Sequence, residues 1–235
     1  MLGHQETFMR QIRTFSEERN NGWCVYCGGQ YETDDHSPSR VLLDKPYPEN
    51  LPVVPCCRAC NDSFSLDEEY LACLIECART GSAGQGESMR SRIADKLIRT
   101  PSLEARLASA RIETDDAVYW NVEVKRVRNV IVKLAKAHAA YENSEPMLDP
   151  PTRLWINPLC TMTREQREHF EAPINTGVWP EAGSRVLHQI VVAAEGDYDW
   201  IEVQPERYRY LVAVGDSVVV RIVISEYLAA EACWD

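Results

Sequence analysis

The stretches Cys24-Val25-Tyr26-Cys27 and Cys57-Arg58-Ala59-Cys60 have the same spacing, two cysteines separated by two residues. Within each pair the two sulfurs lie about one turn apart, so both can reach one metal ion. Two such pairs are the usual ligand set of a closed, tetrahedral zinc site. We therefore predict that these four cysteines bind a structural Zn²⁺. Residues 28–56 separate the pairs and leave room for a hairpin.

The other cysteines leave few alternatives to this assignment. One alternative is that Cys56 replaces Cys57 as a ligand, but this would break the two-residue spacing. Another is that the four cysteines are buried free thiols, but buried thiols do not need to occur in two matched pairs. Cys73 and Cys77 stand four residues apart without a partner pair, and we expect them in the hydrophobic core. Nine cysteines clustered in this way favour metal binding in a reducing compartment over a disulfide framework.

The composition is that of an ordinary globular protein, with 45% hydrophobic and 26% charged residues in a chain of 235. We see no secretory signal and no apolar run long enough to span a bilayer, so we expect a cytoplasmic protein without a membrane partner.

The net charge of −11 is unevenly distributed along the chain. Residues 90–136 hold eleven basic and six acidic residues, whereas residues 145–235 hold seven basic and fifteen acidic residues. The first segment is compatible with nucleic-acid binding, because local charge decides where a polyanion can dock. The second suits a protein partner or solvent.

Periodicity and turn residues divide the chain into four predicted segments. They are a leading helix in 1–22, a zinc-binding module in 23–80, a helical extension in 81–145 and an acidic α+β domain in 146–235.

The last segment changes from helical periodicity to strand patterns. The predicted strands are 186–194, 200–203, 208–214 and 217–224. Gly196-Asp197 and Gly215-Asp216 are the predicted hairpin turns between them. We therefore predict an α+β fold, in which an α-helical part carries the zinc module and a small antiparallel β-meander follows.

Three further groups accompany the cysteine pairs: Asp35-His36, Asn50-Leu51 and, directly after Cys60, Asn61. Together with the cysteines they resemble the HNH endonuclease family in its zinc-knuckle form, over about residues 22–75. The resemblance implies a treble-clef, or ββα-metal, finger in which a hairpin, a loop and a helix surround the site. It also implies an enzyme that hydrolyses phosphodiester bonds, with residues 23–80 as its catalytic module.

The resemblance implies a role for each of these residues. His36 would be the general base that activates water, and Asn50 would orient its ring. Asp35 and Asn61 would ligate a catalytic Mg²⁺ or Mn²⁺. This chemistry is sound in itself, because imidazole can deprotonate water near neutral pH and a cation with two protein oxygens keeps positions open for phosphate and water. The alternative for His36 is a histidine hydrogen-bonded in a loop or bound to zinc.

Two parts of the chain offer contacts to nucleic acid. Arg40 and Arg58 flank the motif itself. On a helical wheel, residues 125–141 separate an apolar face from a basic face, and the alternative is that the basic face only meets solvent. The basic face consists of Lys125, Arg126, Lys133 and Lys136.

The sequence therefore predicts a metal-dependent HNH endonuclease that cuts DNA. One alternative is a non-catalytic treble-clef module that binds nucleic acid or protein. Another is a nuclease that cuts RNA, since no base-reading motif distinguishes the two substrates. The charge asymmetry and the resemblance to the HNH family also suggest a partner protein, such as an ATPase or sensor subunit of a bacterial defence system.

Overall fold

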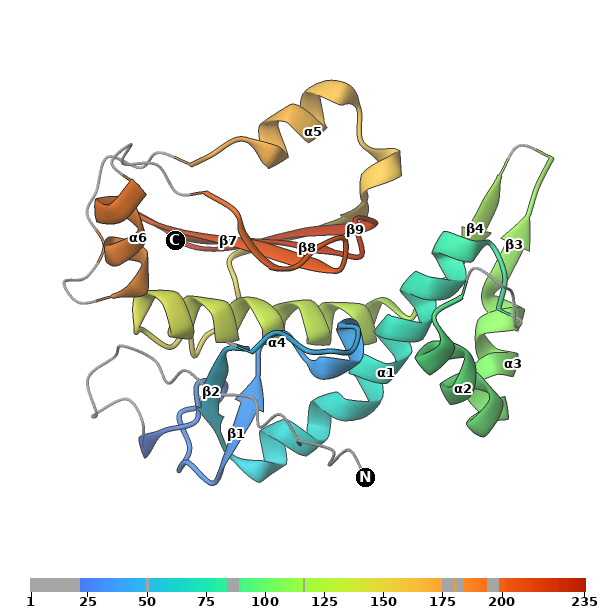
Figure 1. Ribbon diagram of the computed structural model, residues 1–235, viewed down its shortest axis with the longest axis horizontal. Coiled ribbons are helices and arrows are strands. Elements are labelled where there is room, and N and C mark those ends of the chain that lie inside the picture. The colour runs from blue at the N-terminus through green and yellow to red at the C-terminus, as the bar shows by residue number, and fades with distance from the viewer. Residues whose placement is uncertain are drawn as a thin grey trace, which may run out of the picture.

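A computed structural model describes residues 22–49, 51–83, 89–115, 117–174, 180, 184–193 and 199–235 (Figure 1). Three predictions lie outside the described residues: the leading helix apart from Gly22, the role of Asn50 and the turn at Gly196-Asp197. The rest forms a mixed helix and sheet fold.

The cysteine-rich region folds as a hairpin followed by a helix. Strand β1 (Thr33–His36) pairs antiparallel with β2 (Val53–Cys56), and helix α1 (Arg58–Thr80) follows at once. The connection between the strands contains a short 3-10 helix, η2 (Arg40–Leu42). Helix α1 ends at Gly81, whose φ of 71° is a left-handed conformation that glycine adopts at little cost.

The helical extension consists of two short helices and a small hairpin before the longest helix of this part. Pro101 begins the second short helix, as expected at a first helical position. The elements are α2 (Ser91–Arg99), α3 (Pro101–Ala110), β3 (Arg111–Glu113), β4 (Val118–Trp120) and α4 (Val124–Asn143).

The C-terminal part contains a five-stranded antiparallel sheet in the order β5-β9-β8-β7-β6. The predicted meander is confirmed, because β6 to β9 follow one another and Gly215-Asp216 lies in the turn between β7 and β8. The elements are β5 (Arg153–Pro158), η3 (Leu159–Thr161), α5 (Arg164–Glu171), α6 (Arg185–Ala193), β6 (Ile201–Gln204), β7 (Tyr208–Val214), β8 (Val218–Ile224) and β9 (Leu228–Trp234).

The strand predicted at 186–194 is wrong, because this segment is helix α6. Val186 and Ile190 are both buried, and they stand four residues apart. The apolar run therefore follows the spacing of one helix face rather than the alternation of a strand.

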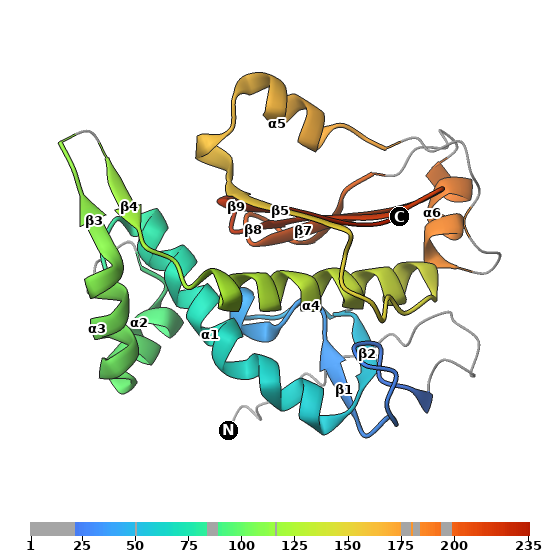
Figure 2. The same ribbon diagram turned by 180° about the vertical axis from the view of Figure 1, so that it is seen from behind.

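Helix α4 lies between the sheet and the cysteine-rich hairpin, and both views show this layer (Figures 1 and 2). It contacts α1 and β2 on one side and β7, β8 and β9 on the other. The predicted basic face of α4 is therefore wrong in part: Lys133 and Lys136 are only 1% and 8% exposed. The helical wheel assumed that one face of α4 packs against the protein and the other meets solvent, whereas α4 packs against the protein on both faces.

The main hydrophobic core crosses the predicted boundary at 145/146. It includes Leu71 of α1, Val130 of α4 and Leu211 of β7 within one cluster of buried residues. The division into four segments stays a prediction. In the described ranges, no helix combines the length and the apolar character needed to cross a bilayer.

Candidate metal centre and adjoining polar site

The four predicted zinc ligands converge. The sulfurs of Cys24, Cys27, Cys57 and Cys60 all lie within 4.8 Å of one another, and those of Cys27 and Cys57 are 3.8 Å apart. A tetrahedron with zinc–sulfur bonds of about 2.3 Å has sulfur–sulfur edges of about 3.8 Å, so these residues fit a structural zinc. Cys56 is not part of the cluster, so it does not replace Cys57.

Local backbone geometry brings each pair together. The amide of Gly29 points to the sulfur of Cys27, and the amide of Cys60 points to the sulfur of Cys57, both at 3.4 Å. Gly28 has a φ of 71°, and a Cβ there would also lie 3.2 Å from Leu148, so glycine suits this turn. These backbone contacts place the two sulfurs of each pair on the same side of their turn.

The amide of Cys60 and burial influence the pKa values of three of the four thiols. The hydrogen bond from the Cys60 amide lowers the pKa of the Cys57 thiol, whereas burial raises the pKa of Cys24 and Cys60. A zinc ion binds thiolates, so metal binding would release protons from Cys24 and Cys60.

Cys73 and Cys77 lie in the hydrophobic core on α1, as predicted. Burial raises the pKa of Cys73 to about 11 and that of Cys77 to about 12. Both are therefore neutral thiols that pack as small apolar side chains.

Asp35 lies at the end of β1 and is linked to the first cysteine knuckle. The hydroxyl of Tyr26, which lies between Cys24 and Cys27 in the chain, donates to Oδ2 of Asp35 at 2.6 Å. The ammonium group of Lys133 lies 2.7 Å from the same oxygen. Oδ1 is the carboxylate oxygen that makes no hydrogen bond or ion pair within the described ranges.

Lys133 is the centre of a buried network that sequence analysis missed. Its Nζ lies 2.8 Å from Oε1 of Glu68 and 3.0 Å from Oγ of Ser39. Burial acts to lower the pKa of Lys133, but Asp35 and Glu68 outweigh burial and raise it. The charged lysine therefore ties α4 to β1, to the loop after β1 and to α1.

His36 follows Asp35 and is half-buried. Its Nε2 lies 2.8 Å from NH2 of Arg40. A guanidinium is only a donor, so Nε2 must accept and the ring carries its proton on Nδ1. Burial, and then the charge of Arg40, lower the pKa of His36. The imidazole is therefore neutral, the form in which it can act as a base.

Asn61 lies in the first turn of α1, directly after Cys60 of the cysteine cluster. Three residues later, Phe64 packs edge-on against Tyr26 with ring centroids 5.1 Å apart, and it lies 5.9 Å from Nζ of Lys133. Residues three apart share one side of a helix, so Asn61 lies on the side of α1 that faces the Asp35 network. Its side chain makes no hydrogen bond with any described residue.

The remaining basic residues differ in their exposure. Arg40, Arg58 and Lys125 are exposed. Arg126 forms ion pairs with Asp67 at 3.1 Å and Glu123 at 2.8 Å, so its charge is offset.

Lys136 donates to two backbone carbonyl groups, those of Leu148 at 2.6 Å and Tyr26 at 3.4 Å. The prediction that Lys133 and Lys136 contact nucleic acid is therefore wrong, because both ammonium groups are used inside the protein.

His138 is a core histidine, as its place on the apolar face of α4 predicted. Its ring stacks on Tyr210 with centroids 3.8 Å apart, and its Nε2 lies 2.8 Å from the hydroxyl of Tyr208. The hydroxyl of Ser37, next to His36, lies 3.3 Å from the same nitrogen. Burial lowers the pKa of His138 to about 3. The loop after β1 is thus connected through α4 to the sheet.

No protein-family model, curated protein or solved structure matches this chain.

Proposed function

We propose that this chain is a metal-dependent endonuclease of the HNH type that hydrolyses phosphodiester bonds of DNA. One arrangement supports the proposal: a hairpin and a helix bring four sulfurs together, with Asp35 and His36 at the end of the first strand and Asn61 in the first helical turn. This is the arrangement expected of a treble-clef, ββα-metal finger.

His36 is the proposed general base. Its Nε2 accepts a proton from water, and the water oxygen forms a bond to phosphorus while the bond from phosphorus to the leaving 3′-oxygen breaks. That oxygen then takes a proton from solvent. Arg40 must first leave Nε2 of His36. A positioned base of this kind is worth about a hundred- to ten-thousand-fold in rate.

The proposed ligands of a catalytic Mg²⁺ or Mn²⁺ are Oδ1 of Asp35 and the amide oxygen of Asn61. Both are hard donors, and neither atom makes a hydrogen bond with a described residue, so both atoms are available to such an ion. When bound, the ion stabilises the charge on the phosphate and on the leaving oxygen. Lys133 and Tyr26 fix the orientation of Asp35 through its other oxygen.

Replacement of the base is the most direct test. The unsubstituted protein and His36→Ala are compared on plasmid, linear and single-stranded DNA and on RNA, with Mg²⁺ or Mn²⁺, after their zinc contents are shown to be equal. We expect His36→Ala to lose cleavage at least about a hundredfold. His169→Ala is the matched control, because His169 is an exposed histidine on α5. Equal cleavage by the unsubstituted protein and His36→Ala would remove the proposed base, and cleavage of RNA alone would change the substrate.

A non-catalytic zinc module that binds nucleic acid is the second candidate. It is favoured by the internal partners of the two proposed catalytic groups, Lys133 with Asp35 and Arg40 with His36. In that case the unsubstituted protein retains zinc and binds nucleic acid but cleaves no substrate under any of these conditions.

A partner protein, such as an ATPase or sensor subunit of a defence system, would be the regulator of the proposed nuclease. The acidic C-terminal part is its proposed docking region. Native mass measurement of a strict monomer with full, unregulated cleavage would remove this part of the proposal.

A further inference from the structure

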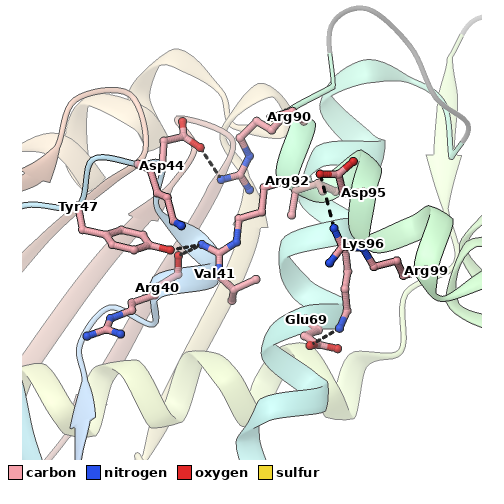
Figure 3. Close-up of a pocket in the computed structure, with 13 residues that line it drawn as sticks. Arg40, Val41, Asp44, Tyr47, Glu69, Arg90, Arg92, Asp95, Lys96 and Arg99 are labelled. Carbon is pink, nitrogen blue, oxygen red and sulfur yellow. Dashed lines mark hydrogen bonds and ion pairs between the residues drawn. The ribbon is translucent and has the colours of Figure 1, made fainter. Parts of the chain in front are cut away.

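A cleft of about 970 Å³ lies between the loop after β1 and helix α2 (Figure 3). Its lining contains twice as many basic as acidic side chains, and the basic ones come from both walls. They are Arg40, Lys45, Arg90, Arg92, Lys96 and Arg99.

Two of these cations are neutralised inside the wall of the cleft. Arg90 lies 2.9 Å from the buried carboxylate of Glu76 and 3.2 Å from Asp44. Lys96 pairs with Glu69 at 2.5 Å. These ion pairs attach the start of α2 to the β1–β2 loop and to α1, and they leave little charge for a ligand.

Three cations in the cleft have no acidic partner among the described residues: Arg40, Lys45 and Arg92. Arg92 donates to the backbone oxygen of Arg40 at 2.8 Å and to the hydroxyl of Tyr47 at 2.5 Å. The guanidinium carbons of Arg40 and Arg92 each lie 5.8 Å from the centre of the Tyr47 ring. The loop and α2 therefore present three cations that form no ion pair with a described residue.

The cleft adjoins the candidate catalytic site. Arg40 lines the cleft and contacts Nε2 of His36, the atom proposed to take the proton from water. A phosphate bound by Arg40 therefore lies next to His36. Guanidinium groups bind phosphate oxygens with two parallel hydrogen bonds, which suits this position.

We propose that the cleft binds the phosphodiester backbone of a nucleic-acid strand and leads it to His36, with Arg40, Arg92 and Lys45 contacting phosphates. This proposal rests on the proposed function and names its substrate-binding surface. Cations on both walls suit a charged chain that passes between them, and contacts to phosphate hold a strand without reading its sequence.

The test measures binding separately from cleavage. Labelled single-stranded and duplex DNA are titrated with protein carrying His36→Ala, and fluorescence anisotropy is recorded over a range of salt concentrations. Adding Arg92→Ala should weaken binding about tenfold and reduce the slope of log affinity against log salt by about one. Lys45→Glu should weaken it further, because it reverses a charge. Arg164→Ala is the matched control, since this arginine on α5 is 92% exposed and far from the cleft in the sequence.

Folding is checked by zinc content and thermal melting. Arg92 also holds the loop, whereas Lys45 is exposed and makes no ion pair or side-chain hydrogen bond with a described residue. Loss of affinity in Lys45→Glu at unchanged melting therefore identifies a binding contact.

The outcomes separate the cleft from the nuclease. Unchanged affinity and salt dependence in both cleft variants, or no binding by the parent protein, overturns the cleft proposal even if the protein cleaves DNA. Loss of binding in the cleft variants supports it even if no cleavage is ever observed, and then only the nuclease proposal fails.

Discussion

The cysteine-rich hairpin and the C-terminal sheet are ordered by different interactions. The hairpin has a small apolar cluster, and its order depends on four sulfurs and on the ion network of Lys133. The sheet has continuous antiparallel register between its strands and contributes many apolar residues to the main core. Apolar packing is non-directional, so it cannot aim a carboxylate or an imidazole. The residues of the proposed catalytic site accordingly lie where directional contacts determine the structure.

Removal of the metal should give the largest difference between the two regions. Binding of structural zinc is worth about 10–16 kcal/mol in small zinc-finger peptides. A chelator, or Cys60→Ser, should therefore abolish hydrogen-exchange protection of the amides in β1 and β2 while those in β7 and β8 keep theirs. Cys160→Ser is the control, because Cys160 is exposed and outside the cluster. Retained protection of β1 and β2 without metal would show that the hairpin is stable by itself.

Loss of the buried lysine should have the next largest effect. Lys133→Met leaves the carboxylates of Asp35 and Glu68 without their cation, and breaking a buried ion pair in this way costs about 3–5 kcal/mol of unfolding free energy. Urea unfolding measures the change. Lys125→Met on the same helix is the control; Lys125 is exposed, and its replacement should change stability by no more than about 0.5 kcal/mol. Equal stability of the two variants would mean that the network contributes little to the hairpin.

Low pH should lower the unfolding free energy through His138, which connects the loop after β1 to the sheet. His138 has a pKa of about 3 in the fold and an ordinary value of 6.5 when unfolded, because it is buried and near the charge of Lys133. Below pH 6.5 the unfolded chain therefore binds a proton that the folded chain does not, and the unfolding free energy falls as pH falls. One such group contributes about 1.4 kcal/mol per pH unit down to about pH 3.

In His138→Asn the unfolding free energy should fall less steeply with falling pH, by up to about 1.4 kcal/mol per pH unit. The measurement is urea unfolding at several pH values between 4.5 and 6.5, with His169→Ala as the exposed control. The uncharged groups that face the ring, Ser37, Tyr208 and Tyr210, are kept in both proteins. Parallel curves for wild type and His138→Asn would exclude this histidine as a source of acid sensitivity.

Short-range patterns of the sequence predicted the four-cysteine cluster and much of the sheet. The spacing of the cysteine pairs alone selects Cys57 over Cys56, and strand alternation gives β7 and β8 with their turn. Strand β9 was missed, because its sequence Leu-Ala-Ala-Glu-Ala-Cys-Trp has little β propensity. Pairing with β5 and β8 on both sides decides its conformation.

The environment of the candidate site was less predictable, because it depends on contacts between distant segments. Lys133 looks like a surface residue on a wheel, and nothing local indicates that Asp35, Ser39 and Glu68 surround it. The cleft is similar, since its unpaired cations come from the loop after β1 and from α2. The acidic run Asp67-Glu68-Glu69 in α1 is the sequence feature that suggests a cation on a facing helix.

Helix α4 has a consequence for any attempt to transplant the cysteine-rich hairpin into another protein. Its residues Ala137, Ala140 and Tyr141 pack against the knuckles, and Lys133 supplies the cation for Asp35. A cassette ending at Thr80 would carry all four sulfurs and the proposed base but would lose this support. A graft that is meant to keep the orientation of Asp35 must therefore include α4, together with a surface that replaces the sheet beneath it.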